Sequence, residues 1–252
     1  MERRPAATRL ASLSERNTEG SQNAYARFAG LMYFFTVFDV TGVVILSRIT
    51  GSGSFLETAH AVAAWETLYR IGLLCGLVGT VSTVLLAIGL YVTLKPVDGN
   101  LAIAALIFRL AESVIGAVVI VLEFATLQIY LDASHTSAFN AGQMGVLADL
   151  VSRTSTIGTQ VSVIFFSVGS ATFFYLFLRS GYIPRLLATW GLLGSLLCFA
   201  AFFASLVLPH SAELLTGFGG LPIGIAEPVV GFWLLVWGIK KQAQRSPVAD
   251  PA

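Results

Sequence analysis

The chain has 252 residues, of which 56% are hydrophobic and only 12% charged, and its formal net charge is +1. Soluble domains carry about 25% charged residues, so this composition argues against a soluble domain and points to the lipid bilayer. The near-zero net charge also argues against nucleic-acid binding, which needs a clustered basic surface. The two cysteines, Cys75 and Cys198, lie in apolar segments and indicate no disulfide framework.

Six apolar segments are long enough to cross a membrane, since a spanning helix needs about 20 mainly apolar residues. They cover residues 28–47, 71–94, 101–131, 157–178, 186–208 and 217–239. The predicted fold class is therefore an all-α integral membrane protein, a six-transmembrane helix bundle over residues 28–239. Residues 1–27 are polar, and we expect a disordered cytoplasmic tail there. A second cytoplasmic tail is expected over residues 240–252.

The positions of Lys and Arg predict the orientation of this bundle. Eleven of these residues fall on one side of the predicted spans: Arg3, Arg4, Arg9, Arg16, Arg27, Lys95, Arg179, Arg185, Lys240, Lys241 and Arg245. Three fall on the other side: Arg48, Arg70 and Arg153. Because basic residues concentrate in cytoplasmic segments, both termini are expected in the cytoplasm.

Two of the outer connections contain apolar residues at helical spacing. They are "GSFLETAHAVAAWETLYR" (53–70) and "NAGQMGVLADLVSR" (140–153). We expect two short amphipathic helices on the outer membrane face. They are either interfacial packing or lids over an outer vestibule.

The third span carries three charged residues, Arg109, Glu112 and Glu123, although a charge at the bilayer centre costs roughly 2.5 kcal/mol or more. At 100° per residue all three lie on one stripe of the helix, which must face protein or water. Arg109 and Glu112 are three residues apart and can pair directly. Glu123 lies about 16 Å further along the helix and needs another partner.

Two more acids lie in the middle of predicted spans, Asp39 in the first and Glu227 in the sixth. Pro222 and Pro228 flank Glu227 and withhold backbone donors, so a kinked or broken helix is predicted there. We interpret Arg109, Glu112, Glu123, Asp39 and Glu227 as a buried polar seam that binds a ligand. A purely structural seam is the alternative.

An internal repeat is also predicted. The pattern A-E-x-V-[IV]-G occurs at Glu112 and again at Glu227, 115 residues later, and Arg70 matches Arg185 at the same offset. A repeat of three spans would insert its second copy upside down, an architecture in which many transporters place a site at the repeat interface. Glu112 and Glu227 would then face one another. The alternative is two helix pairs of similar composition.

Catalytic and metal chemistry find little support in the sequence. One histidine falls in each outer connection, at His60, His135 and His210, but the spacing matches no ligand motif. No H-E-x-x-H, G-x-S-x-G or phosphate-loop motif is present. We therefore predict no metal, no cofactor and no enzymatic activity.

Several segments resemble a known family. They are "RFAGLMY" (27–33), "LYVTLKPV" (90–97), "FRLAE" (108–112), "FLRSGYIPR" (177–185) and "AEPVVGFWLLVWG" (226–238). Together they resemble the bacterial membrane family called domain of unknown function 4386. The resemblance implies a multi-span protein of the bacterial cytoplasmic membrane and no particular activity. The expected function is transporter-like, or binding of a small molecule or ion, and the alternative is a non-transporting scaffold or accessory subunit. Membrane lipids are expected partners, and a homo-oligomer is compatible with the sequence.

Overall fold

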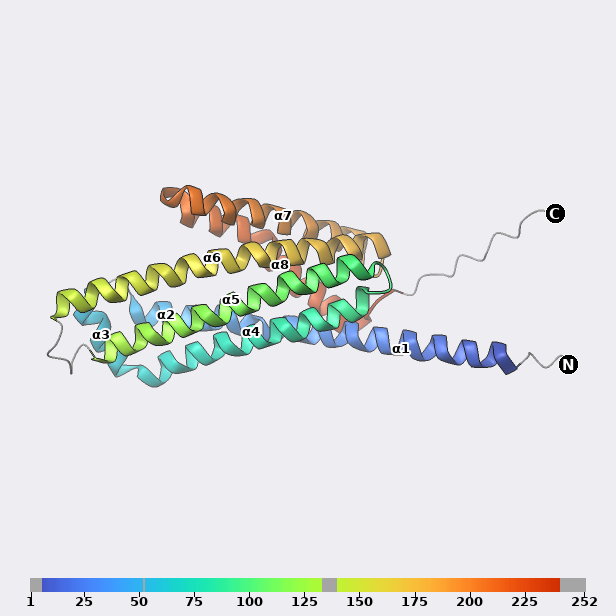
Figure 1. The fold of residues 1–252 in the computed structure, drawn as a ribbon, viewed down its shortest axis with the longest axis horizontal. Helices are drawn as coiled ribbons and strands as arrows, with labels where there is room; N and C mark the ends of the chain where they lie inside the picture. The colour runs from blue at the N-terminus through green and yellow to red at the C-terminus, as the bar shows by residue number, and fades with distance from the viewer. Residues whose placement is uncertain (1–5, 52, 133–139, 241–252) are drawn as a thin grey trace.

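The structure is a computed structural model that describes residues 6–51, 53–132 and 140–240. This part of the chain is almost entirely helical and contains no strand (Figure 1). The helices are α1 (Ala6–Phe35), α2 (Val37–Thr50), α3 (Phe55–Ala64), α4 (Glu66–Leu94), α5 (Gly99–Asp132), α6 (Ala141–Ser180), α7 (Arg185–Val207), a 3₁₀ turn η1 (Pro209–Ser211), and α8 (Ala212–Trp237).

Six helical segments in the described residues are long and apolar enough to cross a membrane, which confirms the predicted fold class. The first combines α1 and α2 over Gly20–Thr50, and the others correspond to α4, α5, α6, α7 and α8. The protein is a multi-pass membrane protein. The start of α1 and the end of α8 lie toward the same end of the bundle, which we call the terminal end (Figure 1). The opposite end, which carries α3, is the distal end.

The spans form a ring in which each helix packs on its neighbours in sequence. α4 packs on α5, α5 on α6, α6 on α7 and α7 on α8. The ring closes where α1 contacts both α4 and α8. At the distal end, α7 and α8 stop well short of the position that α5 and α6 reach (Figure 1). The ring is therefore less complete at that end.

The first span is broken at Thr36, a feature that was not predicted. The Thr36 hydroxyl donates to the Tyr33 carbonyl at 2.7 Å. The Asp39 N–H donates to the Thr36 carbonyl at 3.0 Å, three residues back rather than four. Local side-chain bonds of this kind compete with the helical ladder. The chain therefore changes from α1 to α2 within the membrane, and Asp39 falls in the first turn of α2.

The predicted disordered tail over residues 1–27 is wrong for the residues that the structure describes, because α1 begins at Ala6. The segment contains many good helix formers such as Ala, Leu, Arg and Glu, and it extends a helix that is already packed. Gln22 Nε2 donates to the Thr93 carbonyl at 2.7 Å and to the Tyr182 hydroxyl at 3.1 Å. Residues 1–5, and the predicted tail beyond Lys240, lie outside the described part of the chain.

Of the two predicted amphipathic helices, only the first is separate. α3 begins with a capping box formed by Ser54 and Glu57, as in the prediction of a short helix. The second is wrong: residues 141–153 are the first turns of the 40-residue helix α6. Asn140 and Gln143 cap its start reciprocally, and nothing ends it before Gly181, which adopts the left-handed conformation at φ 66°.

The predicted kink or break around Glu227 is not present as a break, because α8 is continuous through Pro222 and Pro228. A neighbouring helix supports this segment closely. A Cβ added at Gly194 of α7 would lie only 3.0 Å from the Ile223 nitrogen. Membrane helices tolerate proline where such packing holds the backbone.

The buried apolar residues form two separate clusters. The larger one, near the terminal end, joins α1, α4, α5, α6, α7 and α8 around Phe173, Phe174 and Phe177. The smaller one, near the distal end, joins α2, α3, α4 and α5 around Val62 and Tyr69. On α5, the charged residues Arg109, Glu112 and Glu123 lie between Ala105 of the larger cluster and Leu127 of the smaller one.

Candidate binding site

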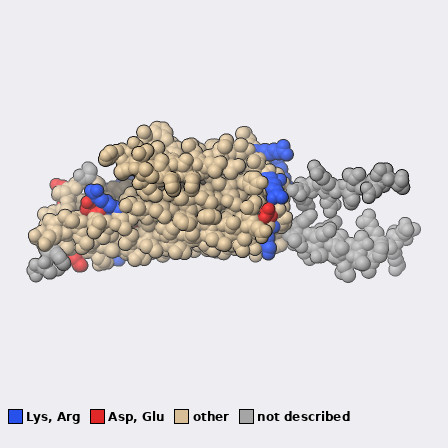
Figure 2. Space-filling model, turned by 45° about the horizontal axis from the view of Figure 1, so that its top comes forward, with Lys and Arg blue, Asp and Glu red and all other residues tan. Residues whose placement is uncertain are grey.

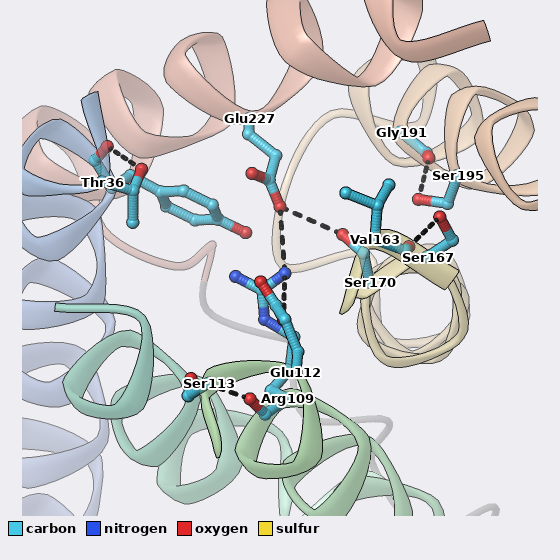
Figure 3. Close-up of polar contacts among 11 residues, drawn as sticks. Thr36, Arg109, Glu112, Ser113, Val163, Ser167, Ser170, Gly191, Ser195 and Glu227 are labelled. Atoms are coloured by element: carbon cyan, nitrogen blue, oxygen red, sulfur yellow. Dashed lines mark hydrogen bonds and ion pairs between the residues drawn. The ribbon is translucent and has the colours of Figure 1, made fainter. Parts of the chain in front are cut away.

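Arg109 lies at the centre of a buried charge cluster (Figure 3). It is only 2% exposed. Its Nη1 atom lies 3.2 Å from Glu112 Oε2, so the predicted ion pair is confirmed. The same atom lies 3.9 Å from Glu227 Oε1, on the opposite helix α8. One guanidinium therefore serves two carboxylates that are 115 residues apart in the sequence.

Helix α6 supports this cluster from the side. The Ser170 hydroxyl donates to Glu227 Oε1 at 3.1 Å. The Arg109 guanidinium lies over the Phe166 ring, 4.7 Å from its centroid, which is a favourable cation–π geometry. A Cβ added at Gly169 would lie 2.9 Å from Arg109 Cγ, so the glycine gives the arginine its space. We call Arg109, Glu112, Glu227, Ser170 and Phe166 the arginine cluster.

The Arg109–Glu112 contact is electrostatic rather than a well-formed hydrogen bond. Arg109 Nη1 and Glu112 Oε2 are both buried, and within the described residues neither has a hydrogen-bond partner. Glu112 is also held through its backbone, because the Ser162 hydroxyl donates to its carbonyl at 3.0 Å. The pair is thus matched in charge but leaves hydrogen-bonding capacity unused.

Asp39 reaches the bundle interior from the first turn of α2. An added Cβ at Gly79 of α4 would overlap the Asp39 carboxyl group, so this glycine forms a notch that receives the aspartate. α2 is held on α4 in a similar way by Gly42, where an added Cβ would lie 2.5 Å from the Gly72 carbonyl oxygen. Asp39 makes no ion pair with Arg109 and stands apart from the arginine cluster.

Glu123 has its own partner, as predicted from its distance to Arg109. The Ser155 hydroxyl of α6 donates to Glu123 Oε1 at 2.5 Å. The buried side chain of Tyr69 on α4 also lies close enough to interact with it. Glu123 therefore joins α4, α5 and α6 on the distal side of the arginine cluster.

A cavity of about 740 Å³ lies between these acids. Asp39, Glu112 and Glu123 all line it, on α2 and α5. Most of the remaining wall is apolar, and eight of its residues carry hydroxyl or amide groups: Ser47, Thr80, Ser155, Thr156, Thr159, Gln160, Ser162 and Thr216. Its volume falls within the usual range of about 300–1,000 Å³ for small-molecule sites. Arg109 and Glu227 do not line it and lie behind Glu112.

The sequence profile of the family described as "Domain of unknown function (DUF4386)" matches residues 28–238 of this chain. The chain belongs to the DUF4386 family. The match covers all six spans almost completely, and the family description names no activity. No curated protein matched the chain. No solved structure matched it either. The function of this DUF4386 protein must therefore be argued from its own residues.

The five predicted seam residues of the DUF4386 chain separate into two groups. Arg109, Glu112 and Glu227 meet in the arginine cluster, whereas Asp39 and Glu123 meet Glu112 only across the cavity. The predicted approach of Glu112 and Glu227 is confirmed, because both contact the same atom of Arg109. The duplication behind that prediction stays a prediction, since a ring of sequential neighbours does not require related halves.

Several residues of this site were missed by sequence reasoning. Ser155, Ser162 and Ser170 of α6 each contact an acidic residue of the seam. They are seven and eight residues apart, which places them on one helix face, and this spacing is a signal that the sequence contains. The notch at Gly79 and the break at Thr36 had no comparable signal.

The described part of this DUF4386 protein contains no cluster of metal-ligating side chains. No group of three His, Cys, Asp or Glu residues there could hold a metal ion. His60 and His210 are exposed, and His135 lies outside the described residues.

Proposed function

We propose that this DUF4386 protein binds a positively charged small molecule or ion in the cavity lined by Asp39, Glu112 and Glu123. The supporting observation is an excess of acidic over basic side chains around this cavity. Glu112 shares Arg109 with Glu227, whereas Asp39 and Glu123 reach the same cavity without an ion-pair partner among the described residues. A carboxyl group inside a membrane is either protonated or accompanied by a cation. A bound cation would supply the missing charge.

The broken first span supports a transporter-like role. Many transporters build their substrate sites at discontinuous helices near the middle of the membrane. Here the discontinuity at Thr36 places Asp39 in the first turn of α2, and Asp39 lines the cavity. A helix break beside a charged cavity fits alternating access, in which one part of a bundle moves against another around a fixed site. We further propose that the protein transports this ligand across the membrane.

Binding is proposed rather than catalysis. The cavity wall, as described, carries carboxyl, hydroxyl and amide groups but no His, Cys or Lys side chain. Ser155 donates to the Glu123 carboxylate on this wall. The wall as described carries no His or Lys, the bases that ordinarily activate a serine or threonine nucleophile. The proposed partners are membrane lipids and the ligand, without nucleic acid.

A structural role for the charges is the second candidate, and the arginine cluster favours it. Arg109 is matched by two carboxylates, and it ties α5 to α8 with support from α6. Such a cluster fixes the relative position of helices without a ligand. We assign this structural role to the arginine cluster and the binding role to the cavity, with Glu112 belonging to both.

Thermal unfolding in lipid nanodiscs tests the proposal. The probes are the chlorides of sodium, tetramethylammonium and tetraphenylphosphonium. These cations increase in size, so they sample different fits to the cavity. A ligand that binds the folded state stabilises it by about 2.7 kcal/mol at 100 times its Kd. We expect at least one probe to raise the unfolding temperature, and Asp39→Asn and Glu112→Gln to reduce that rise. Glu66→Gln is the matched control, because Glu66 is an exposed acid at the start of α4.

Two results would contradict the proposal. One is that no probe changes the unfolding temperature at any concentration up to the millimolar range, roughly the weakest affinity of a specific site. The other is that Asp39→Asn and Glu112→Gln respond to the probes as the unmodified protein does.

The orientation in the membrane is also proposed, with both termini in the cytoplasm of a bacterial cell. Lys and Arg side chains gather at the terminal end, and the face shown is uncharged over a broad middle band (Figure 2). Lys95, Arg179 and Arg185 flank the short connections there. Basic segments stay in the cytoplasm. A reporter fused after Leu94 should be cytoplasmic and one fused after Leu208 external; the reverse pattern would overturn this orientation.

A further inference from the structure

Three glycines on one face of α8 mark where the contact between α8 and the first span ends. Gly217, Gly224 and Gly231 are spaced by seven residues, so they lie on one stripe of the helix. At Gly231 an added Cβ would lie 2.5 Å from Tyr33 Cβ of α1. At Gly224 and Gly217, nothing lies within 4 Å of an added Cβ. The contact that closes the ring near the terminal end is therefore absent along the same stripe nearer the distal end.

The break at Thr36 accounts for this opening. α1 packs tightly on α8, since an added Cβ at Gly30 would lie 2.7 Å from the Gly231 carbonyl oxygen. Beyond the break, α2 packs on α4, and no Cα atom of α2 lies within 8 Å of one in α8, although every residue of both helices is described. The first span thus closes the ring with its first half and leaves it open with its second half.

The cavity extends to this opening. Val43 of α2 and Gly217 of α8 both line the cavity, and both are exposed at the surface, Val43 by 67%. Their exposed neighbours are apolar, with Val40 on α2 and Phe218 and Leu221 on α8. α2 belongs to the first span and α8 to the sixth, each long and apolar enough to cross a membrane, and we infer that these exposed apolar residues face lipid. The opening between α2 and α8 connects the cavity with the hydrocarbon region of the bilayer. We call it the side opening.

The chemistry of the wall changes along this route. Acids stand on its inner part, with Asp39 in the Gly79 notch and Glu112 against the arginine cluster. Val43 and Gly217, at the side opening, offer no charge or hydrogen-bonding side chain. The other exposed wall residues carry uncharged hydroxyl groups: Ser47, Thr156 and Thr159. A molecule that matches both parts has a cationic group at one end and an apolar body at the other, because lipid gives a bare charge no partner.

We propose that the ligand is an amphiphilic cation that enters the cavity from the bilayer between α2 and α8. Its charged group lies near Asp39 and Glu112, and its apolar body lies toward Val43, Gly217 and the lipid. This proposal rests on the proposed function and adds the class of ligand and the route of entry.

The test compares three probes that share either the cationic head group or the apolar tail. Dodecyltrimethylammonium carries the cation and a long apolar tail, tetramethylammonium carries the cation alone, and dodecyl maltoside carries the same tail without charge. Each is titrated calorimetrically into protein-loaded nanodiscs, and heats from empty discs are subtracted because the tails partition into lipid. We expect dodecyltrimethylammonium to bind at least about tenfold more tightly than either other probe.

Variants at the side opening test the route. Gly217→Trp adds a large side chain where nothing lies within 4 Å, so it should fill the opening without a clash. We expect it to weaken dodecyltrimethylammonium binding at least about tenfold. Ile225→Trp, on an exposed position of α8 that does not line the cavity, is the control and should bind as the unmodified protein does. Val43→Trp repeats the test from α2 if Gly217→Trp fails to fold.

The outcomes separate the two proposals. Unchanged binding in a folded Gly217→Trp or Val43→Trp variant overturns the side route. If dodecyltrimethylammonium and tetramethylammonium bind with equal affinity, and Asp39→Asn abolishes the binding of both, the ligand is not an amphiphile. The proposed function stands in that case. If neither cation binds the unmodified protein, this inference is wrong, and the proposed function is also wrong if sodium and tetraphenylphosphonium leave the unfolding temperature unchanged.

Discussion

Replacing Arg109 by Leu should be the most destabilising single change in the arginine cluster. At an effective dielectric constant of about 20, a unit charge pair at 3.2 Å gains about 5 kcal/mol, and one at 3.9 Å about 4 kcal/mol. Burial of the charges offsets much of this energy while the cluster is intact. Removing the one cation leaves two buried carboxylates without it, and breaking a buried pair costs about 3–5 kcal/mol. We expect Arg109→Leu to lose that much stability.

The geometry also predicts an asymmetry between the partners of the pair. Glu112→Leu should cost less than Arg109→Leu, because Arg109 keeps its contact with Glu227. The double variant Arg109→Leu/Glu112→Leu should be more stable than Arg109→Leu alone, since one uncompensated carboxylate is gone. A simple pair without Glu227 would predict similar losses for both single variants.

Unfolding in mixed micelles of dodecyl maltoside and sodium dodecyl sulfate, followed by circular dichroism, measures these differences. Ile107→Leu, at a 59% exposed position of the same helix, is the control and should change little. The reasoning is refuted if Arg109→Leu unfolds like this control. It is also refuted if the double variant is no more stable than Arg109→Leu, because the coupling energy of the pair would then be absent.

Two further predictions concern the notch and the connection between α4 and α5. Gly79→Ala should displace the Asp39 carboxyl group and weaken tetramethylammonium or dodecyltrimethylammonium binding, whereas Gly224→Ala, in open space, should not; equal affinities would show that the notch is irrelevant. The pKa of Asp98 lies below its usual value, because the carboxylate accepts a backbone N–H from the start of α5 and contacts Arg179 at 3.0 Å. Its contribution is complete above the ordinary aspartate pKa of about 3.9 and is lost as the pH falls through the lowered folded value. Amide exchange slows intrinsically as the pH falls, so the quantity to measure is the protection factor, which corrects for that effect. The protection factors of this connection should fall on acidification, and Asp98→Asn should remove that fall; protection factors that do not change with pH would contradict this explanation.

Local signals in the sequence predicted the parts of the fold that depend on single helices. Long apolar segments predicted the six spans, and a spacing of three residues predicted the Arg109–Glu112 pair, because both follow from hydrophobicity and helix geometry. The prolines around Glu227 were misleading, since packing of α7 against α8 keeps that helix continuous. The break in the first span lies instead at Thr36, in an apolar segment without proline or glycine beside it.

The cavity could not be predicted from the sequence, for a different physical reason. It depends on how α2 diverges from α8, two helices far apart in the chain, and on which side chains fail to fill the space between them. Glycines such as Gly79 and Gly217 look alike in the sequence, yet one receives a carboxylate and the other faces an opening. The acids were recognisable as a seam, whereas the division between arginine cluster and cavity appears only in three dimensions.

Native mass spectrometry of the protein released from nanodiscs is the most direct measurement of the central claim, that the cavity binds a cationic ligand. Discs containing dodecyltrimethylammonium should release the unmodified protein with one bound probe molecule. The variant Asp39→Asn/Glu112→Gln, folded to the same extent, should be released without it. An adduct of equal abundance in both proteins, or in neither, would contradict the account.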